Sequence, residues 1–296
     1  MKPPLPRQKQ QDSLGPNPGN NFPNPMPAKD DGFQFIDGDI EIINRVHELR
    51  LAHIGHLATL TGRSEKALSR RLLKLLQHGY LSCITRRPQK HLYVVGSEGL
   101  AALVEAGFAP QELIDHRPRH SELKELWLRH FLLVVDIHTA LIRGTRTGSV
   151  RLIKWKEGQT LWDRVTFRDQ GKQATLPVRP DAFFTLRDAS RPEGKNTLYF
   201  FLEADRSTMS HDRMESKLKA YVQYFQQGLH ARKHAGVKLF QVLTVTQTPQ
   251  RAQSLAAAMK DVIPAQAQRW YHFTPLSKLS VDALLPPAAG AAPNEP

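Results

Sequence analysis

The sequence has 296 residues, and its 41 Lys and Arg against 28 Asp and Glu give a formal net charge of +13 at pH 7. This basic excess favours a polyanionic partner, either nucleic acid or an anionic membrane surface. The single cysteine, Cys83, excludes internal disulfides and Cys-rich zinc sites, and the absence of an apolar run approaching about 18–20 residues argues against a membrane-spanning helix.

Both ends of the chain have the composition of unstructured tails. Residues 1–32 contain eight prolines and few large apolar side chains, and residues 281–296 are rich in Pro, Ala and Gly. Such segments bury too little apolar surface to offset the entropy lost on ordering. We therefore predict disordered tails at 1–32 and 281–296. The PPLP near the start has the pattern of a polyproline ligand, but we interpret it as part of a solvated tail.

The first folded segment, residues 33–115, has the pattern of a winged helix-turn-helix. Apolar residues recur at helical spacing after Asp39, a short second helix stops at Gly62, and Ser64 is a suitable N-cap for a third. Two short β-prone runs, YLSCIT and HLYVV, follow with a basic connection between them, and the helix SEGLAALVEAGF closes the segment. The order helix, helix, helix, strand, strand, helix predicts a winged helix.

Basic residues are concentrated where such a domain contacts DNA. Residues 61–93 hold eight Lys and Arg and one acid, and a recognition helix and a wing both need cations or donors toward the duplex. The predicted DNA-binding residues are Arg63, Lys66, Arg70, Lys74, Arg86, Arg87 and Lys90. Two alternatives remain: these charges solvate an exposed helix face, or the winged helix binds a protein.

A second domain is predicted over residues 120–280. A long helix, apolar on most sides, precedes the strand VRLIKWKE and a looser basic stretch that runs to residue 179. Two strands, a helix, the apolar strand VKLFQVLTVT, a further helix and the short strand RWYHF complete the order. The core order is αβββαβ, with one helix and one strand appended.

Three titratable residues, His130, Asp136 and His138, lie on the long helix, and such residue types are potential metal ligands. Asp136 lies nearly opposite His130 on a helix, so helical geometry does not bring the three together. We interpret the histidines as core or capping residues.

The strongest candidate for chemistry is a group of carboxylates on two adjacent strands. Asp181 follows Pro180 at the start of one strand, and Glu203 and Asp205 end the next, on one face of it. If these strands form a hairpin, Asp181 lies beside Glu203, and carboxylates brought together in this way either hold a divalent cation, for which Mg²⁺ or Mn²⁺ is favoured, or repel each other at a cost. Lys217, on the following helix, is placed to point toward them.

This arrangement resembles the PD-(D/E)xK nuclease-like fold. Together with the upstream winged helix, it is similar to the replication-relaxation family of bacterial plasmids and integrative elements over about residues 40–280. The segments that carry the resemblance are RSEKALSRRLLKLLQHGYL, LRHFLLVVDIHTAL, IKWKE, RPDAFF, FFLEADRSTMSHDRMESKLKAYVQYF and FTPLSKL.

The resemblance implies an α/β protein, α+β overall, in which an N-terminal winged helix-turn-helix precedes an αβββαβ restriction-endonuclease-like domain. It implies that Asp181 and Glu203 are the metal-binding acids for Mg or Mn. The lysine expected two residues after Glu203 is Asp205 here, and Lys217 stands where some nucleases of this fold carry the displaced lysine. The predicted catalytic set is Asp181, Glu203, Asp205 and Lys217.

The preferred hypothesis is a DNA-binding protein of a mobile element, acting in replication initiation, DNA relaxation or mobilisation, with metal-dependent nicking left open. Its expected partners are double-stranded DNA and other replication or relaxosome proteins, and a homodimer is also left open. Its expected location is the bacterial cytoplasm, at the nucleoid or plasmid and not at a membrane. The alternatives are a non-enzymatic transcription regulator and an adaptor with a protein-binding winged helix. A true relaxase is disfavoured, because the sequence has no metal-binding histidine run.

Overall fold

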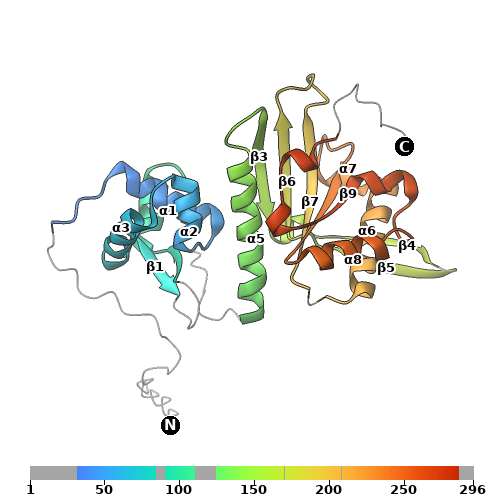
Figure 1. Ribbon diagram of the computed structural model, residues 1–296, viewed down its shortest axis with the longest axis horizontal. Helices are drawn as coiled ribbons and strands as arrows, with labels where there is room; N and C mark the ends of the chain where they lie inside the picture. The colour runs from blue at the N-terminus through green and yellow to red at the C-terminus, as the bar shows by residue number, and fades with distance from the viewer. Residues whose placement is uncertain (1–31, 85–90, 111–124, 170, 208, 287–296) are drawn as a thin grey trace, which may run out of the picture.

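The computed structural model describes residues 32–84, 91–110, 125–169, 171–207 and 209–286. A small N-terminal part and a larger part built on a sheet lie on opposite sides of one long helix, α5 (Figure 1). The predicted tail at 1–32 lies outside the described residues apart from Gly32, and so does the predicted tail from residue 287 onward.

The N-terminal part has the predicted order of elements. These are α1 (Asp37–Leu49), α2 (Ile54–Thr61), α3 (Glu65–Gln77), β1 (Leu81–Ile84), β2 (Leu92–Val95) and α4 (Ser97–Glu105). The two strands pair antiparallel. Leu68, Leu72 and Leu75 of α3 are fully buried among apolar residues of α1 and α2, and burying each such side chain stabilises the fold by roughly 1.5–3 kcal/mol.

Local capping sets the turn between α2 and α3. Gly62 ends α2 in the left-handed region, with φ of 71°, which glycine adopts without the steric cost of a Cβ atom. Two residues later the hydroxyl of Ser64 accepts the N–H of Ala67 at 3.3 Å and begins α3. The predicted boundaries of this helical pair at Gly62 and Ser64 are therefore confirmed.

Helix α5 (Glu125–Gly144) is shared between the two parts of the chain. Val135 belongs to the apolar cluster of the N-terminal part. Leu133, Val134, Ile137 and Leu141 instead pack against the sheet. This double contact explains why the sequence of the helix is apolar on most of its sides.

The larger part is a five-stranded mixed sheet with strand order β3-β6-β7-β8-β9. The β3–β6 and β6–β7 pairs are antiparallel, and the β7–β8 and β8–β9 pairs are parallel. The strand bounds are β3 Val150–Glu157, β6 Ala182–Asp188, β7 Thr197–Asp205, β8 Gln241–Thr246 and β9 Tyr271–Pro275. All six residues of β8 are buried, as its apolar run predicted.

Helices cover both faces of this sheet. α5 packs on one face, and α6 (His211–Gln226) and α8 (Pro249–Ala258) pack on the other. The short helix α7 (Leu229–Lys233) follows α6. Short 3₁₀ helices complete the fold at η3 Gln159–Leu161, η4 Ala265–Trp270, η5 Leu276–Lys278 and η6 Asp282–Leu284.

The basic stretch before residue 179 is not the loose segment that the sequence suggested. It forms an antiparallel hairpin of β4 (Asp163–Asp169) and β5 (Lys172–Val178), which we call the β4–β5 ribbon. Val165 and Val178, on one face, are buried against α6. Apolar and polar side chains alternate along the two strands. The apolar face therefore packs on α6 and stabilises the ribbon, while the polar face is exposed to solvent.

The predicted C-terminal tail begins too early. Val281 and Leu284 are buried in the apolar cluster between α5 and the sheet, and the guanidinium of Arg191 donates a hydrogen bond to the carbonyl of Pro286. The ordered chain therefore extends through residue 286, because two apolar side chains in an otherwise tail-like segment dock on the core. Among the described residues, no helix is both long and apolar enough to span a bilayer.

Candidate functional site

The two candidate carboxylates lie beside each other at one end of the sheet. Ala182 pairs with Leu202, and the N–H of Asp181 donates to the carbonyl of Leu202 at 2.9 Å. This register sets Asp181 opposite Glu203, as the hairpin hypothesis required. The ends of β3, β7 and β8 lie at the same edge, where ligand sites of α/β sheets commonly form.

Glu203 is buried, with 1% of its surface exposed, and α6 supplies both of its side-chain partners. The ammonium of Lys217 donates to Oε2, and the hydroxyl of Tyr221 donates to Oε1 at 2.6 Å. The two donors lie four residues apart, one helical turn, so both face the sheet. The predicted contact between Lys217 and the carboxylates is therefore present.

His130 is the member of this cluster that the sequence analysis missed. Its Nε2 donates to Oδ1 of Asp181 at 3.0 Å, while the backbone N–H of Ala204 donates to Oδ2 at 2.7 Å. The sequence pattern favours a core or capping role for His130, because helical spacing describes neighbours within one helix only. Its partner comes from a strand 51 residues away.

His138, in contrast, is the core residue that the sequence suggested. It is buried and stacks on the ring of Trp155, with 3.9 Å between ring centroids. Burial, with a smaller contribution from Arg45, lowers the pKa of His138 to about 3. This imidazole is therefore neutral at ordinary pH.

The cluster balances its charges internally. Burial alone raises the pKa of Asp181, but the hydrogen bond from His130 and the charge of Lys217 outweigh it and leave that pKa lowered. The hydrogen bond to Asp181 raises the pKa of His130. Burial raises the pKa of Glu203 in spite of Lys217, and burial together with Glu203 raises the pKa of the Tyr221 phenol far above its usual range. The lysine pKa is raised, because the two carboxylates outweigh its burial.

Asp205, the fourth predicted catalytic residue, has different partners. Its Oδ2 accepts the Nε–H of Arg251 of α8 at 2.6 Å, and its Oδ1 accepts the N–H of Ser207 at 3.1 Å. Arg251 also donates to the carbonyl of Met209. These contacts give Asp205 a structural role in fixing the loop after β7 against α8.

The donor set at Asp181 and Glu203 matches a hard divalent cation in ligand type, since carboxylate oxygens are the ligands that Mg²⁺ and Mn²⁺ prefer. All four oxygens, however, accept hydrogen bonds from His130, Ala204, Lys217 or Tyr221. A cation bound there would have to share these oxygens with the present donors or displace those donors. Carboxylate oxygens have the second lone pair that sharing requires.

The predicted DNA-binding residues on α3 and just before it divide into two groups. Lys66 and Arg70 are exposed on the face opposite the buried leucines, with Ser69 between them. Arg63 instead donates to Glu41 of α1 at 3.1 Å, and Lys74 is half-buried. Arg86, Arg87 and Lys90 belong to the segment 85–90, outside the described residues.

Arg71, also on α3, was not assigned a role from the sequence. Its guanidinium makes an ion pair with the fully buried carboxylate of Asp39 of α1, and it donates to the carbonyl of Gln34 at 2.6 Å. The side-chain hydrogen bond to Asp39 raises its pKa. Arg71 therefore fixes α3 on α1 and does not belong to the exposed basic face of Lys66 and Arg70.

A second polar cluster joins the N-terminal part to α5. One ligand atom from each of His53, His56 and Asp136 lies within 4.8 Å of the others. Hydrogen bonds already account for them: Nδ1 of His53 accepts the N–H groups of Gly55 and His56, and Nε2 of His56 donates to Asp136 at 2.7 Å. These hydrogen bonds give the cluster a structural role in joining the start of α2 to α5.

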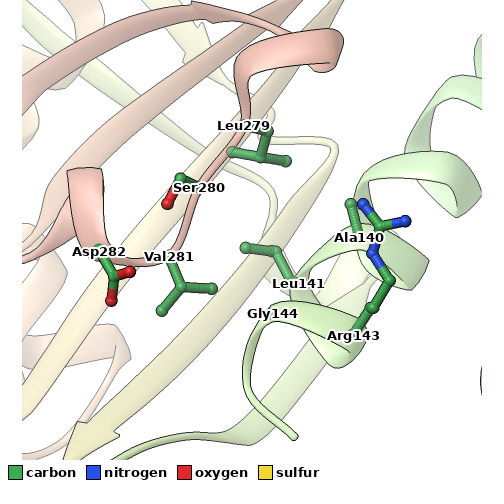
Figure 2. A pocket seen from close by; sticks show the side chains of 8 residues that line it. All are labelled: Ala140, Leu141, Arg143, Gly144, Leu279, Ser280, Val281 and Asp282. Carbon is green, nitrogen blue, oxygen red and sulfur yellow. The ribbon is translucent and has the colours of Figure 1, made fainter. Parts of the chain in front are cut away.

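A small hollow lies at the other end of α5, between that helix and the segment 279–282 (Figure 2). Its volume is about 180 Å³, and Ala140, Arg143, Ser280 and Asp282 are among the residues that line it. Ala140 lies ten residues along α5 from His130, or about 15 Å. The hollow is therefore separate from the carboxylate cluster.

These features define a class: an α/β protein in which a three-helix module with a short hairpin is fixed by a shared helix to a mixed sheet carrying a buried carboxylate–lysine–histidine cluster. The sequence model described as replication-relaxation matches residues 43–240, more than half of the chain. The chain belongs to the replication-relaxation family. Comparison with curated proteins gave no match, and comparison with solved structures gave none.

Proposed function

We propose that the protein binds double-stranded DNA through its N-terminal module and acts in the replication or relaxation of a plasmid or integrative element. The observation that carries this proposal is the exposed face of α3, where Lys66, Ser69 and Arg70 project opposite a fully buried leucine stripe. A helix held in this way by a short helix-turn-helix pair is the geometry that enters the major groove. Membership of the replication-relaxation family supports the same assignment.

The test is a binding titration of a supercoiled plasmid and of a short duplex, measured over a range of salt concentrations. Lys66→Gln combined with Arg70→Gln removes two cations and is expected to lower the salt slope by about 1.8 and the affinity about tenfold or more. The matched control, Arg187→Gln with Lys195→Gln, removes two exposed cations from the opposite end of the sheet. Equal affinities and salt slopes for all three proteins would contradict the proposal.

A second candidate function is metal-dependent nicking of DNA at the carboxylate cluster. The specific observation in its favour is that Glu203 has Asp181 opposite it and the ammonium of Lys217 on one of its oxygens. In this mechanism Asp181 and Glu203 would hold Mg²⁺ or Mn²⁺, and the cation would supply an activated water and stabilise charge on the phosphate. Lys217 contributes a cation toward the same phosphate, and His130 holds or moves a proton at Nε2.

The nicking assay incubates supercoiled plasmid with the intact protein and Mg²⁺ or Mn²⁺. Nicking that disappears in both Asp181→Ala and Glu203→Ala, but remains in Arg187→Gln, would establish the activity. Intact plasmid under all conditions, combined with normal DNA binding, would assign the protein to the non-enzymatic regulator class. Thermal unfolding with and without the cation reports binding separately from cleavage.

A further inference from the structure

The β4–β5 ribbon has two chemically distinct faces. Val165, Phe167, Leu176 and Val178 form the inner face, which packs against α6 and its neighbours. The outer face carries the side chains between them, all exposed: Arg164, Thr166, Arg168, Gln173, Thr175 and Pro177. In Figure 1 the ribbon extends from the end of the sheet beneath α6.

This outer face is cationic and rich in hydrogen-bond donors. Its charged members are Arg164 and Arg168, and the acids of the two strands lie on the inner face. Asp163 accepts the hydroxyl of Tyr224 at 3.2 Å, and the ammonium of Lys233 lies 3.8 Å from it. Thr166 and Thr175 face each other across the strands, with 3.0 Å between their hydroxyl oxygens.

More cations surround the base of the ribbon. The guanidinium of Arg179 stacks on the exposed ring of Trp162, 4.8 Å from its centroid. Lys154 and Lys156 of β3 lie close enough to His234 that, after burial, their charges and that of Lys233 lower the pKa of that imidazole to about 4. The base of the ribbon is therefore a region of positive potential.

The position of the ribbon connects this surface to the candidate site. The ribbon joins the end of β3, at Glu157, to the start of β6, at Ala182, directly after Asp181. Its base therefore flanks the carboxylate cluster. A polyanion that follows the ribbon is led to the end of the sheet where that cluster lies.

We propose that the outer face of the β4–β5 ribbon is a second contact surface for double-stranded DNA. The α-carbons of Arg164 and Arg168 are separated by about 13 Å in an extended strand, which is close to the roughly 12 Å width of the major groove. The two guanidinium groups contact phosphates on the two sides of the groove, and Thr166, Thr175 and Gln173 face the base edges. This inference rests on the proposed DNA-binding function and adds a site to it.

The experiment compares four forms of the intact chain in duplex-binding titrations across salt concentrations. They are the unmodified protein, the ribbon variant Arg164→Gln with Arg168→Gln, the α3 variant Lys66→Gln with Arg70→Gln, and the control Arg187→Gln with Lys195→Gln. Each variant removes two cations. The ribbon variant is expected to bind about tenfold more weakly or worse, with a salt slope lower by about 1.8, and the control is expected to match the unmodified protein.

Three outcomes overturn the inference in distinguishable ways. If the α3 variant loses affinity and the ribbon variant does not, the ribbon proposal is wrong and the proposed function stands. If the ribbon variant and the control lose affinity equally, the effect is one of net charge alone, and the ribbon is not a site. If the unmodified protein does not bind duplex at low salt, the proposed function is wrong and the inference falls with it. Circular dichroism and thermal unfolding verify that each variant is folded.

A chemical footprint gives an independent readout. Thr175→Cys places a thiol on the outer face, and Lys195→Cys places one at the far end of the sheet, with the buried Cys83 common to both proteins. Saturating duplex is expected to slow maleimide labelling of residue 175 several-fold and to leave residue 195 unchanged. Equal labelling rates at residue 175 with and without DNA would contradict the proposal.

Discussion

At the scale of single residues, the carboxylate of Glu203 depends on the helix that packs over it. Lys217 and Tyr221 donate to its two oxygens, and the side chain is otherwise enclosed. Removing the cation of a buried ion pair destabilises a protein by far more than the intact pair contributes to its stability. The reason is that the remaining carboxylate has neither water nor a counterion.

Lys217→Met is therefore expected to lower the free energy of unfolding by about 2–4 kcal/mol, a loss moderated by the 28% exposure of the lysine side chain. Urea denaturation measures it. The double variant Lys217→Met with Glu203→Gln removes the charge as well as its partner, so we expect it to recover part of the loss. Additive effects of the two substitutions would contradict a direct pair.

The pH dependence of stability distinguishes His130 from His138. The pKa of His130 is raised in the folded state. Its contribution to folding stability is therefore fully present below about pH 6.5, the ordinary pKa of histidine. That contribution is lost as the pH rises through the pKa of His130 in the folded state. Asp181, its partner, has a lowered pKa and stays ionised over this range. The stability difference between the protein and His130→Gln is expected to be largest near pH 5–6 and to shrink toward pH 9, as urea midpoints would record.

His138 on the same helix is the matched control, with the opposite sign. Its folded pKa of about 3 means that only the unfolded chain takes up this proton as pH falls below 6.5, which destabilises the fold. His138→Leu should therefore flatten the acid side of the stability profile. A profile whose slope is unchanged in both variants would contradict these assignments.

At the scale of elements, close backbone packing fixes α4 on the start of β1. A Cβ atom at Gly99 would lie 2.1 Å from the carbonyl oxygen of Tyr80, far inside contact distance. The helix and the strand approach this closely only because residue 99 has no side chain.

Gly99→Ala is expected to destabilise the protein by about 2 kcal/mol or more, although alanine is the better helix former by about 1 kcal/mol. Ala101→Gly, at an exposed position two residues along α4, is the control and should cost about 1 kcal/mol through propensity alone. Thermal unfolding measures both. A Gly99→Ala protein more stable than the unmodified one would show that α4 is free to move away from β1.

At the scale of the whole molecule, α5 joins two apolar cores. Val135 packs into the N-terminal core and its neighbours pack on the sheet, and the guanidinium of Arg146 donates to the carbonyl of Leu60. His56, buried in the N-terminal part, donates to Asp136 of α5 at 2.7 Å. We therefore expect the two parts to unfold in a single transition.

Asp136→Ala leaves Nε2 of the buried His56 without its acceptor and is expected to cost about 1–3 kcal/mol. Calorimetry should show the single transition of the unmodified protein shift down and broaden or divide, because this contact links the parts. Arg143→Ala, an exposed position on the same helix, should change stability by less than about 0.5 kcal/mol. Two separate transitions in the unmodified protein would contradict the coupling.

The buried apolar strands were predictable from the sequence. The β4–β5 ribbon, which has one solvent-exposed face, was not. β7 and β8 fall where TLYFFLEAD and VKLFQVLTVT lie, because buried strands carry their own signal. The β4–β5 ribbon alternates apolar and charged side chains and includes Pro177, so it was interpreted as a loose stretch. Its packing partner, α6, is remote in the sequence.

The candidate site was also predictable only in part. Asp181, Glu203 and Lys217 follow from strand pairing and helical spacing, both short-range rules. His130 and the partner of Asp205, Arg251, do not, since each contact joins segments 46 or more residues apart. Contacts of this kind depend on the tertiary arrangement, which no local pattern encodes.

The shared helix α5 also determines which segments of this chain can be exchanged with other proteins by recombination. A recombination or deletion between residues 115 and 125 would separate an N-terminal module that lacks Val135 from a sheet domain that exposes it. Each fragment would present an apolar surface to water and tend to associate with others. The unit that can be exchanged is therefore larger than the N-terminal module alone, because a replacement module has to bring a matching face of α5 with it.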